Sequence, residues 1–433
     1  MTPEIKHRIE QIKNGEIPKG YKHSKVGIIP EDWKVLRLKD KFDRLSRKNA
    51  EGNTNVLTIS AQYGLINQEE FFKKEIASDD KSNYYLLHRG EFAYNKSYSN
   101  GYPFGAIKRL SRYDKGVVSP LYICFSANSN NACPEYYEQY FEAGRLNHEI
   151  QAYAQEGARN HGLLNISVID FFNSKIIVPP IAEQKRIAKI LSTQDKVIEC
   201  YEKKLEQFKQ MKKYYLQNMF PKRGETVPKI RFKGFTDPWE QRKVRDVSEI
   251  VAGGTPNTSI DKYWEPKEIP WLASGEVHKK IITFTDDMIS KEGMNNSSAK
   301  LIKEKSLLIA LAGQGKTRGT VAINHIPLTT NQSIAAMTFI NDIVPEFVFC
   351  NLENRYDEIR RMSSGDGSRG GLNKQIVGNI EIPYTSKSEQ ELVGKFFTHF
   401  DNLITLHQRK LEEEKKKKKA LQQLLLTGIV RTN

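Results

Sequence analysis

The segment LLIALAGQGKT, residues 307 to 317, places a Gly-Lys-Thr triplet directly after an apolar run. A strand that runs into such a triplet is typical of a phosphate-binding loop, whose backbone amides and lysine hold the phosphates of a nucleotide. That loop requires a glycine five residues before the triplet, and this position holds Ala310. No acidic magnesium partner is evident. A nucleotide-dependent enzyme therefore stays only as an alternative, which ATP hydrolysis by the purified chain would support.

The segments VPPI, residues 178 to 181, and IPYT, residues 382 to 385, are similar to the Asp/Asn-Pro-Pro-Tyr motif of adenine methyltransferases. Val178 and Ile382 stand where that motif has the polar residue that holds the target amine, so the chemistry cannot run. Both segments are better interpreted as turns before helices, where proline is tolerated. The nine histidines form no H-x-x-x-H pair. The sequence thus predicts a chain without a catalytic site.

Three polar segments carry residue types that recognise nucleic acid. They are YNKSYSNGYP (94 to 103), GQGKTR (313 to 318) and TTNQS (329 to 333). Asn and Gln can make two hydrogen bonds to adenine, and Arg or Lys can do the same with guanine. Lys, Ser, Thr and Tyr also contact phosphates. Asn, Ser and Gly equally form turns, so for each single residue the turn interpretation stands beside base contact.

The overall charge agrees with an anionic partner. The 433 residues include 67 Lys plus Arg against 52 Asp plus Glu, which gives a net charge of +15 and a pI near 9.3. This surplus favours nucleic acid or an acidic membrane surface, although basic ribosomal or structural proteins would share it. A chain of this length predicts two or three domains.

Cysteine usage and hydropathy indicate the compartment. The four scattered cysteines have no paired-ligand spacing, which predicts neither a disulfide framework nor a zinc site and suits a reducing cytoplasm. The N-terminal MTPEIKHRIEQIK is charged from its fourth residue, unlike a signal peptide. No apolar run approaches the roughly 18 residues of a membrane span. We expect a cytosolic protein.

The elements that must position these segments occur twice. Glu183-Gln184 recurs as Glu389-Gln390, and Trp33 recurs as Trp239, each pair 206 positions apart. Repeats of this kind define an architecture. The chain is therefore expected to consist of two half-molecules, each a globular segment followed by a long helix.

Both Glu-Gln pairs begin amphipathic helices. Ten positions at alternating steps of three and four, from 187 to 219, hold eight apolar residues, and the same positions plus 206 hold seven. This spacing predicts a coiled-coil seam, with the two helices antiparallel; the alternative is that each helix covers its own globular domain. A helix from Ala182 to Phe220 would be about 58 Å long. His407, Glu414 and Lys418 are expected to weaken the second stripe.

Two charged segments extend this scheme. Residues 5 to 13 lie 206 positions before residues 211 to 219, and we expect them to supply a helix tip that the second half lacks, as if the repeat were circular. The run Lys415 to Lys419 is interpreted as a solvated helix face, with contact to DNA phosphates as the alternative.

The predicted fold class is α+β. Short apolar runs such as 56 to 60 and 333 to 339 predict strands, and they alternate with helical stretches such as 134 to 154. We expect two mixed α/β domains joined by two long helices packed as an antiparallel coiled coil, with a pseudo-twofold internal repeat. The predicted segments are an N-terminal segment (1–28), a first domain (29–178), a first spacer helix (179–221), a second domain (222–384) and a second spacer helix (385–433).

This arrangement resembles the specificity subunits of Type I restriction–modification enzymes over nearly the whole chain. The segments that carry the resemblance are IPEDW (29 to 33), TISAQYGLI (58 to 66), YNKSYSNGYPFGAIK (94 to 108), ALAGQGKTRG (310 to 319) and the two Glu-Gln helices. Each segment alone is weakly specific, whereas their order and the 206-residue duplication are specific.

The resemblance implies two target-recognition domains, each on one half of a bipartite double-stranded DNA site, with the antiparallel helices fixing the number of bases between the halves. It also implies partners: two methyltransferase subunits that modify adenine N6 with S-adenosylmethionine, and two motor-nuclease subunits that use ATP and magnesium. This chain would hold no cofactor and contact no membrane. The residues expected to contact DNA are Gln62, Tyr63, Asn95, Lys96, Ser97, Tyr98, Asn100, Arg159, Gln314, Lys316, Thr317, Arg318, Asn331, Gln332 and Arg369. The alternative is a stand-alone coiled-coil scaffold that binds or bridges DNA.

Overall fold

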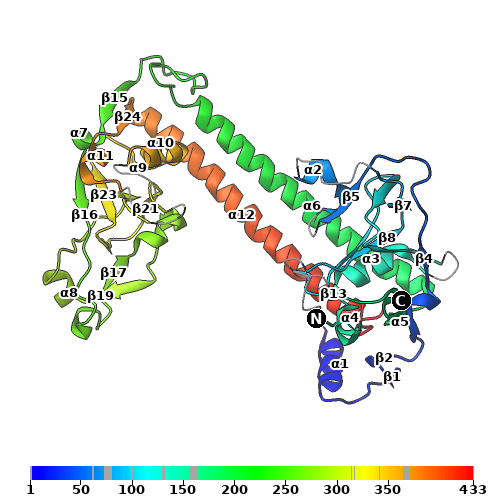
Figure 1. Ribbon diagram of the computed structural model, residues 1–433. Helices are drawn as coiled ribbons and strands as arrows, with labels where there is room; N and C mark the ends of the chain where they lie inside the picture. Colours follow the sequence, from blue (N-terminus) through cyan, green and yellow to red (C-terminus); the bar gives the residue numbers. More distant parts are fainter. Residues whose placement is uncertain are drawn as a thin grey trace. The chain divides into compact units, whose positions relative to one another are not determined.

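The computed structural model describes residues 2–60, 63–72, 80–98, 101–128, 132–153, 155–156, 164–313, 315, 317–340, 342–363 and 371–432 (Figure 1). The chain forms two compact units. Unit 1 comprises Met1–Cys200 and Lys410–Asn433, and unit 2 comprises Tyr201–Arg409. Each unit contains one globular head and part of each long helix. We define the first head as residues 34–178 and the second head as residues 240–384.

Unit 1 begins with short elements and then builds the first head. Its elements before the long helix are α1 (Pro3–Lys13), β1 (Tyr21–Ser24), β2 (Gly27–Pro30), β3 (Lys34–Arg37), η1 (Leu38–Asp40), β4 (Phe42–Leu45), β5 (Leu57–Ser60), β6 (Gly64–Asn67), α2 (Gln68–Phe72), β7 (Tyr85–His88), β8 (Phe92–Asn95), β9 (Ala106–Arg109), β10 (Lys115–Val118), β11 (Ile123–Ala127), α3 (Pro134–Glu142), α4 (Asn147–Tyr153), β12 (Gln155–Glu156), β13 (Leu164–Asn165), α5 (Val168–Asn173) and β14 (Lys175–Val178).

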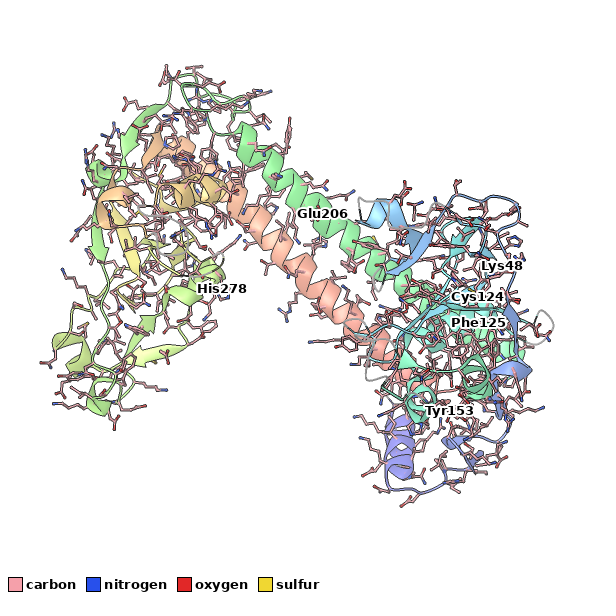
Figure 2. All side chains as sticks on the ribbon, viewed as in Figure 1. Lys48, Cys124, Phe125, Tyr153, Glu206 and His278 are labelled. Atoms are coloured by element: carbon pink, nitrogen blue, oxygen red, sulfur yellow. The ribbon has the colours of Figure 1, made fainter. Side chains whose placement is uncertain are left out.

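A four-stranded antiparallel sheet organises the first head, in the order β4-β11-β8-β9. Successive side chains of a strand point to opposite faces, so Phe125 enters the main aromatic core while Cys124 faces a second, smaller core. Figure 2 labels both residues in the first head. In the main core Phe92 stacks on Phe125, with ring centroids 5.2 Å apart. Helix α3 supplies Tyr137 and Phe141 to the same core. Both faces of the sheet therefore pack against a hydrophobic core.

Unit 2 holds the second head. Its elements are β15 (Glu240–Lys243), α7 (Val244–Val247), β16 (Ser248–Ala252), η2 (Asp261–Tyr263), β17 (Ile269–Leu272), η3 (Ser274–Lys279), β18 (Ile281–Ile282), β19 (Asp287–Ile289), α8 (Lys291–Asn295), β20 (Leu307–Ala310), β21 (Val321–Asn324), β22 (Thr329–Thr330), β23 (Ile334–Phe339), α9 (Pro345–Asn354), α10 (Tyr356–Arg361), α11 (Lys374–Gly378) and β24 (Glu381–Tyr384).

The sheet of the second head repeats that of the first. Its order is β16-β23-β20-β21-β18, in which the first four strands are antiparallel and β18 adds to β21 in parallel. The chain order of these four strands matches that of β4, β11, β8 and β9. Leu307 and Ile309 enter one core, while Leu308 and Ala310 enter the other. The predicted α+β fold with an internal repeat is confirmed.

The first and last strands of each head lie side by side. Strand β3 pairs antiparallel with β14, with Lys34 opposite Val178. Strand β15 pairs in the same way with β24, with Glu240 opposite Tyr384. The chain therefore enters and leaves each head at the same place. A long helix begins directly after the last strand of each head. These helices are α6 (Ile181–Asn218) and α12 (Lys387–Leu425).

The two long helices pack on each other antiparallel, as the spacing predicts. In unit 1, Gln194 of α6 donates to Glu414 of α12 (2.6 Å). In unit 2, Tyr215 of α6 packs against Phe396 of α12, with ring centroids 5.1 Å apart. As the residue number rises along α6, that of its partner on α12 therefore falls.

Two of the three polar residues of the second stripe have polar partners across the seam, contrary to expectation, and the third packs on an aromatic ring. His407 packs on Phe208, with ring centroids 4.9 Å apart, and Glu414 accepts the hydrogen bond from Gln194. Lys418 forms an ion pair with Asp195 (2.5 Å). Glu414 and Lys418 thus have polar partners across the seam, whereas the buried Nδ1 of His407 has no hydrogen-bond partner in the described part of the chain, which is unfavourable.

The predicted helix tip from the N-terminus is wrong. Helix α12 has 39 residues against 38 in α6, so the second half needs no added turn, and α1 is a separate helix. The N-terminal segment instead contacts the end of the chain: Arg8 Nη1 donates to the carbonyl of Ile429 (2.7 Å), and Tyr21 Oη donates to that of Gly428 (2.6 Å). Both ends of the chain therefore meet within unit 1.

None of the helices in the described part of the chain is long and apolar enough to span a membrane.

Candidate nucleic-acid interface

In the first head, the predicted contact loop begins where β8 ends and returns at β9. Asn95 Oδ1 accepts the backbone N–H of Ser97 (3.1 Å), which is a side-chain turn. Gly105 closes the loop at φ +78°, and a Cβ there would lie 2.3 Å from the carbonyl oxygen of Asn95. The oxygen of Asn95 is thus used inside the loop, as the turn interpretation states. Tyr98 beyond it is 63% exposed.

Strand β13 adjoins this loop. The carbonyl of Lys96 accepts the N–H of Leu164 (3.0 Å), so β13 lies beside the end of β8. The side chains of Lys96 and Ser97 are half-buried. Tyr63 occupies the tip of the β5–β6 hairpin, where its N–H donates to Ser60 Oγ (3.3 Å) and its ring is exposed.

In the second head, two predicted segments and the segment before α11 converge on Leu311, directly after β20. Its N–H donates to the carbonyl of Ser333, and its own carbonyl accepts the N–H of Leu372, both at 2.8 Å. Asn331 Oδ1 accepts the N–H of Ser333 (3.1 Å), while Gln332 is exposed. The loop between β20 and β21, the turn before β23 and the segment before α11 therefore lie together.

Two predicted residues in this loop are held inside the second head. Thr317 is half-buried against Gly313, where a Cβ would lie 2.7 Å from the Thr317 side chain. Arg318 is only 9% exposed, so little of its surface faces solvent in the free chain. The sequence indicated a basic loop but not the direction of this side chain. Gln62, Asn100, Arg159, Gln314, Lys316 and Arg369 lie outside the described residues.

The sequence missed one neighbour of Gln332. Thr255 Oγ1 donates to Gln332 Oε1, so the segment after β16 borders the same turn. A Cβ on the adjacent Gly253 would lie 2.1 Å from Thr330 Oγ1, which shows how closely these backbones approach. The consecutive glycines Gly253 and Gly254 were the available signal, because glycine in a strand region marks close approach of another backbone.

The two loop clusters occupy equivalent places. The loop after β8 leads to β9, and the loop after β20 leads to β21, in two sheets of matching order. Each cluster combines amide, hydroxyl and cationic side chains at one sheet edge. Such a set can donate to and accept from base edges and phosphates. Among the described residues, no three His, Cys, Asp or Glu side chains are grouped as metal ligands.

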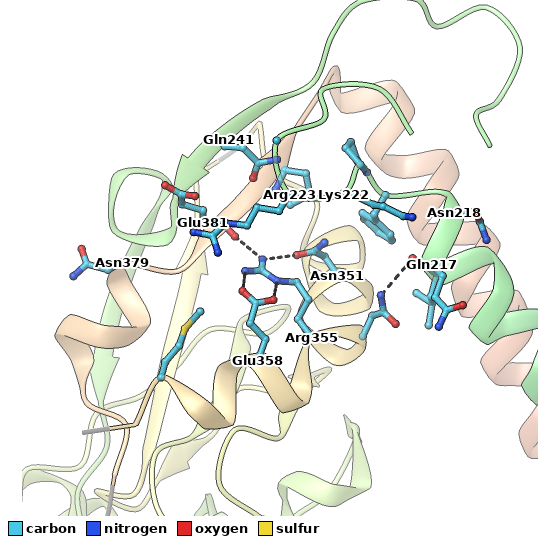
Figure 3. A pocket seen from close by; sticks show the side chains of 17 residues that line it. Gln217, Asn218, Lys222, Arg223, Gln241, Asn351, Arg355, Glu358, Asn379 and Glu381 are labelled. Atoms are coloured by element: carbon cyan, nitrogen blue, oxygen red, sulfur yellow. Dashed lines mark hydrogen bonds and ion pairs between the residues drawn. The ribbon is translucent and has the colours of Figure 1, made fainter. Parts of the chain in front are cut away.

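A cavity of about 860 Å³ in unit 2 is a separate feature (Figure 3). Arg355 at its wall donates to both oxygens of Glu358 (2.8 and 2.7 Å) and to the carbonyl of Glu381 (2.6 Å). The hydrogen bond from Arg355 holds the pKa of Glu358 below its usual value. None of the residues predicted to contact DNA lines this cavity, and Arg355 is already paired with Glu358.

Comparison with known proteins places this geometry in a family. The model of the type I restriction modification DNA specificity domain matches residues 30–210 and again 236–415. The chain is 26% identical, over 93% of its length and 94% of the relative, to the type I restriction enzyme MjaVIII specificity subunit of Methanocaldococcus jannaschii. The crystal structure of the type I restriction-modification system S subunit from M. genitalium has the same fold, with a TM-score of 0.57 at 14% identity, covering 91% of this chain and 96% of that one.

Proposed function

Since this chain belongs to the type I restriction modification DNA specificity family, we propose that its two heads bind the two halves of a split DNA site and direct methylation of adenine N6 by partner subunits. Recognition of DNA is the role of the family. A specificity subunit selects the site and leaves the chemistry to other chains.

The proposal rests on one observation: polar loops lie at equivalent places in the sheets of the two heads. Equivalent loops follow β8 in the first head and β20 in the second. Tyr98 is exposed beyond the first loop, and Gln332 is exposed in the turn beside the second. One head would therefore recognise one short block of bases by contacts in the major groove, where each base pair has its own pattern of donors and acceptors. The net charge of +15 supports phosphate contact, with an affinity that falls as salt rises.

Exposed apolar side chains on the long helices support the proposal that partner subunits dock there. Ile190 and Val197 on α6 are 39% and 36% exposed, and Leu406 on α12 is 51% exposed, although the helices already bury a shared seam. We propose that two methyltransferase subunits bind there and supply S-adenosylmethionine. Two motor-nuclease subunits with ATP and magnesium would complete the enzyme. This chain itself would bind no cofactor.

The test is a map of methylated adenine across the host genome at base resolution, with the gene intact and deleted. We expect a split motif, two short blocks separated by a fixed gap, to be methylated only in the intact strain. Replacing residues 34 to 176 by those of a relative should change one block alone. Unchanged methylation on deletion, with the partner genes expressed, would refute the proposal and leave a DNA-binding scaffold as the better account.

A further inference from the structure

A buried glutamate in the first turn of α6 binds both a tryptophan and an arginine. Glu183 is 2% exposed, and its Oε2 accepts a hydrogen bond from Trp33 Nε1 (2.8 Å). Arg431 donates through Nε to Oε1 and through Nη2 to Oε2, both at 2.8 Å. The N–H of Thr432 adds a longer bond of 3.3 Å. We call Trp33, Glu183 and Arg431 the first clamp; all three lie in unit 1.

Unit 2 contains the same arrangement, built from another part of the chain. Glu389 in the first turn of α12 is fully buried and accepts from Trp239 Nε1 (3.0 Å). Arg231 donates through Nε to Oε1 (2.7 Å) and through Nη2 to Oε2 (2.9 Å). In both units the guanidinium lies over the indole, with its carbon 5.8 and 6.0 Å from the ring centroid. We call Trp239, Glu389 and Arg231 the second clamp.

The path of the chain shows which elements each clamp connects. Arg231 follows the end of α6 at Asn218, whereas Glu389 lies at the start of α12. Arg431 follows the end of α12 at Leu425, whereas Glu183 lies at the start of α6. Each clamp therefore joins the end of one long helix to the beginning of the other and to the tryptophan that precedes a head.

The chemistry of the clamps favours a single geometry. A bidentate arginine–carboxylate pair fixes both the distance and the plane of its partners. The N-terminal end of a helix adds its positive potential to the carboxylate. Two other links lie at the start of α6: the pairing of the four-residue strands β3 and β14, and the side chain of Gln184, which accepts the N–H of Cys133 (3.0 Å). Without the arginine, the first head would be attached to its helix through these two links and the apolar contacts around them.

We propose that Arg431 and Arg231 are positioning residues that fix how each head is held on its helix, and thereby enforce the fixed number of bases between the two halves of the DNA site. This inference rests on the proposed function. Successive bases along a strand are about 3.4 Å apart, so a small rotation of a head would let its loops reach the neighbouring register. DNA with one base more or fewer in the gap would then be accepted.

The experiment maps adenine methylation in strains whose only copy of the gene carries Arg431→Met or Arg231→Met. The readout is methylation at sites with the native gap compared with sites whose gap is one base shorter or longer. We expect each variant to reduce the preference for the native gap about tenfold, which corresponds to about 1.4 kcal/mol. Arg431→Lys should give an intermediate preference, because lysine keeps the charge but lacks the planar fork.

Two exposed arginines provide matched controls. Arg89 in the first head pairs with Asp114, and Arg245 in the second pairs with Asn379, each on an exposed side chain. Methionine at either position should leave the gap preference unchanged. A purely structural role would lower methylation equally at every gap, or lower the melting temperature without changing the preference, and this result would overturn the inference. If Arg431→Met does not accumulate, the outcome for Arg431→Lys decides. Absence of any split motif in the wild-type strain would instead refute the proposed function itself.

Discussion

Replacing Lys212 by methionine should destabilise unit 2, because this lysine is the shared cation of two carboxylates. Its Nζ donates to Glu353 (2.8 Å) and to Asp401 (2.7 Å), and its side chain is 9% exposed. Methionine keeps most of the length of the side chain and removes the charge. The carboxylates of Glu353 and Asp401 would then remain close to each other, with one cation fewer to offset their repulsion.

The cost follows from how buried the carboxylates are. Breaking a fully buried ion pair by removing one partner costs about 3–5 kcal/mol. Here the Glu353 side chain is 17% exposed and keeps an ion pair with Lys280, and that of Asp401 is 33% exposed. Solvent and Lys280 therefore reduce the penalty, and we expect a loss of about 2–3 kcal/mol in the free energy of unfolding at pH 7.

The loss should depend on pH in a defined direction. Burial alone would raise the pKa of Glu353, but Lys212 and Lys280 outweigh it and lower that pKa, whereas burial raises the pKa of Asp401 despite Lys212. Without Lys212, both folded-state pKa values rise. Raised carboxylate pKa values cost stability at high pH and cost less as the groups take up protons. The deficit of the variant should therefore be largest near pH 7 and smaller near pH 4.5.

Urea unfolding of the full chain at pH 7 and pH 4.5 measures both effects. Lys418→Met is the matched control, since among the described residues Lys418 pairs with a single carboxylate, that of Asp195, which also accepts from Gln139 (2.7 Å). It should cost about 1 kcal/mol. A deficit for Lys212→Met below that of the control, or one that is equal at both pH values, would refute the electrostatic reasoning.

Three further predictions concern the candidate interface. Gly105→Ala should destabilise unit 1 by about 2–3 kcal/mol, because the left-handed backbone of Gly105 and its contact with the Asn95 carbonyl both penalise a Cβ. Thermal unfolding measures this loss, and an unchanged melting temperature would contradict the tight loop. Tyr98→Ala should change stability by less than about 0.5 kcal/mol because the ring is exposed, yet weaken binding of the complex to its site about fivefold through one lost hydrogen bond. Asn331→Ala with Gln332→Ala should relax one block of the methylated motif only; relaxation of both blocks would show that the heads do not act separately.

The helices could be predicted because their signal is local and periodic. Apolar residues at steps of three and four fixed the seam, and it was found between α6 and α12 as expected. The partners of its polar members could not be predicted, because Lys418 and Asp195 meet only when the two helices are set in register. The same limit applies to residues 5 to 13. Their offset of 206 from residues 211 to 219 predicts a helix tip, but the full length of α12 is known only from the structure.

The arginines of the two clamps could not be predicted for a different reason. The tryptophans and glutamates follow the 206-residue offset, but Arg231 and Arg431 are 200 positions apart, so the repeat did not reveal that they correspond. In the interface, polar loops were found at equivalent sheet edges. Whether a side chain in such a loop points outward depends on packing of the whole head, as the buried Arg318 shows.

The first clamp also has a consequence for synthesis on the ribosome. Glu183 and its partner Arg431 are 248 residues apart, so at about 5–20 residues per second the arginine emerges roughly 12–50 s after the glutamate. Leu425 and Leu426, which pack into the main core of the first head, arrive equally late. The nascent first head must therefore wait, with apolar surface uncovered, until the whole second head has been made. A premature stop between codons 426 and 431 would leave the second head intact and damage the first, which was translated long before.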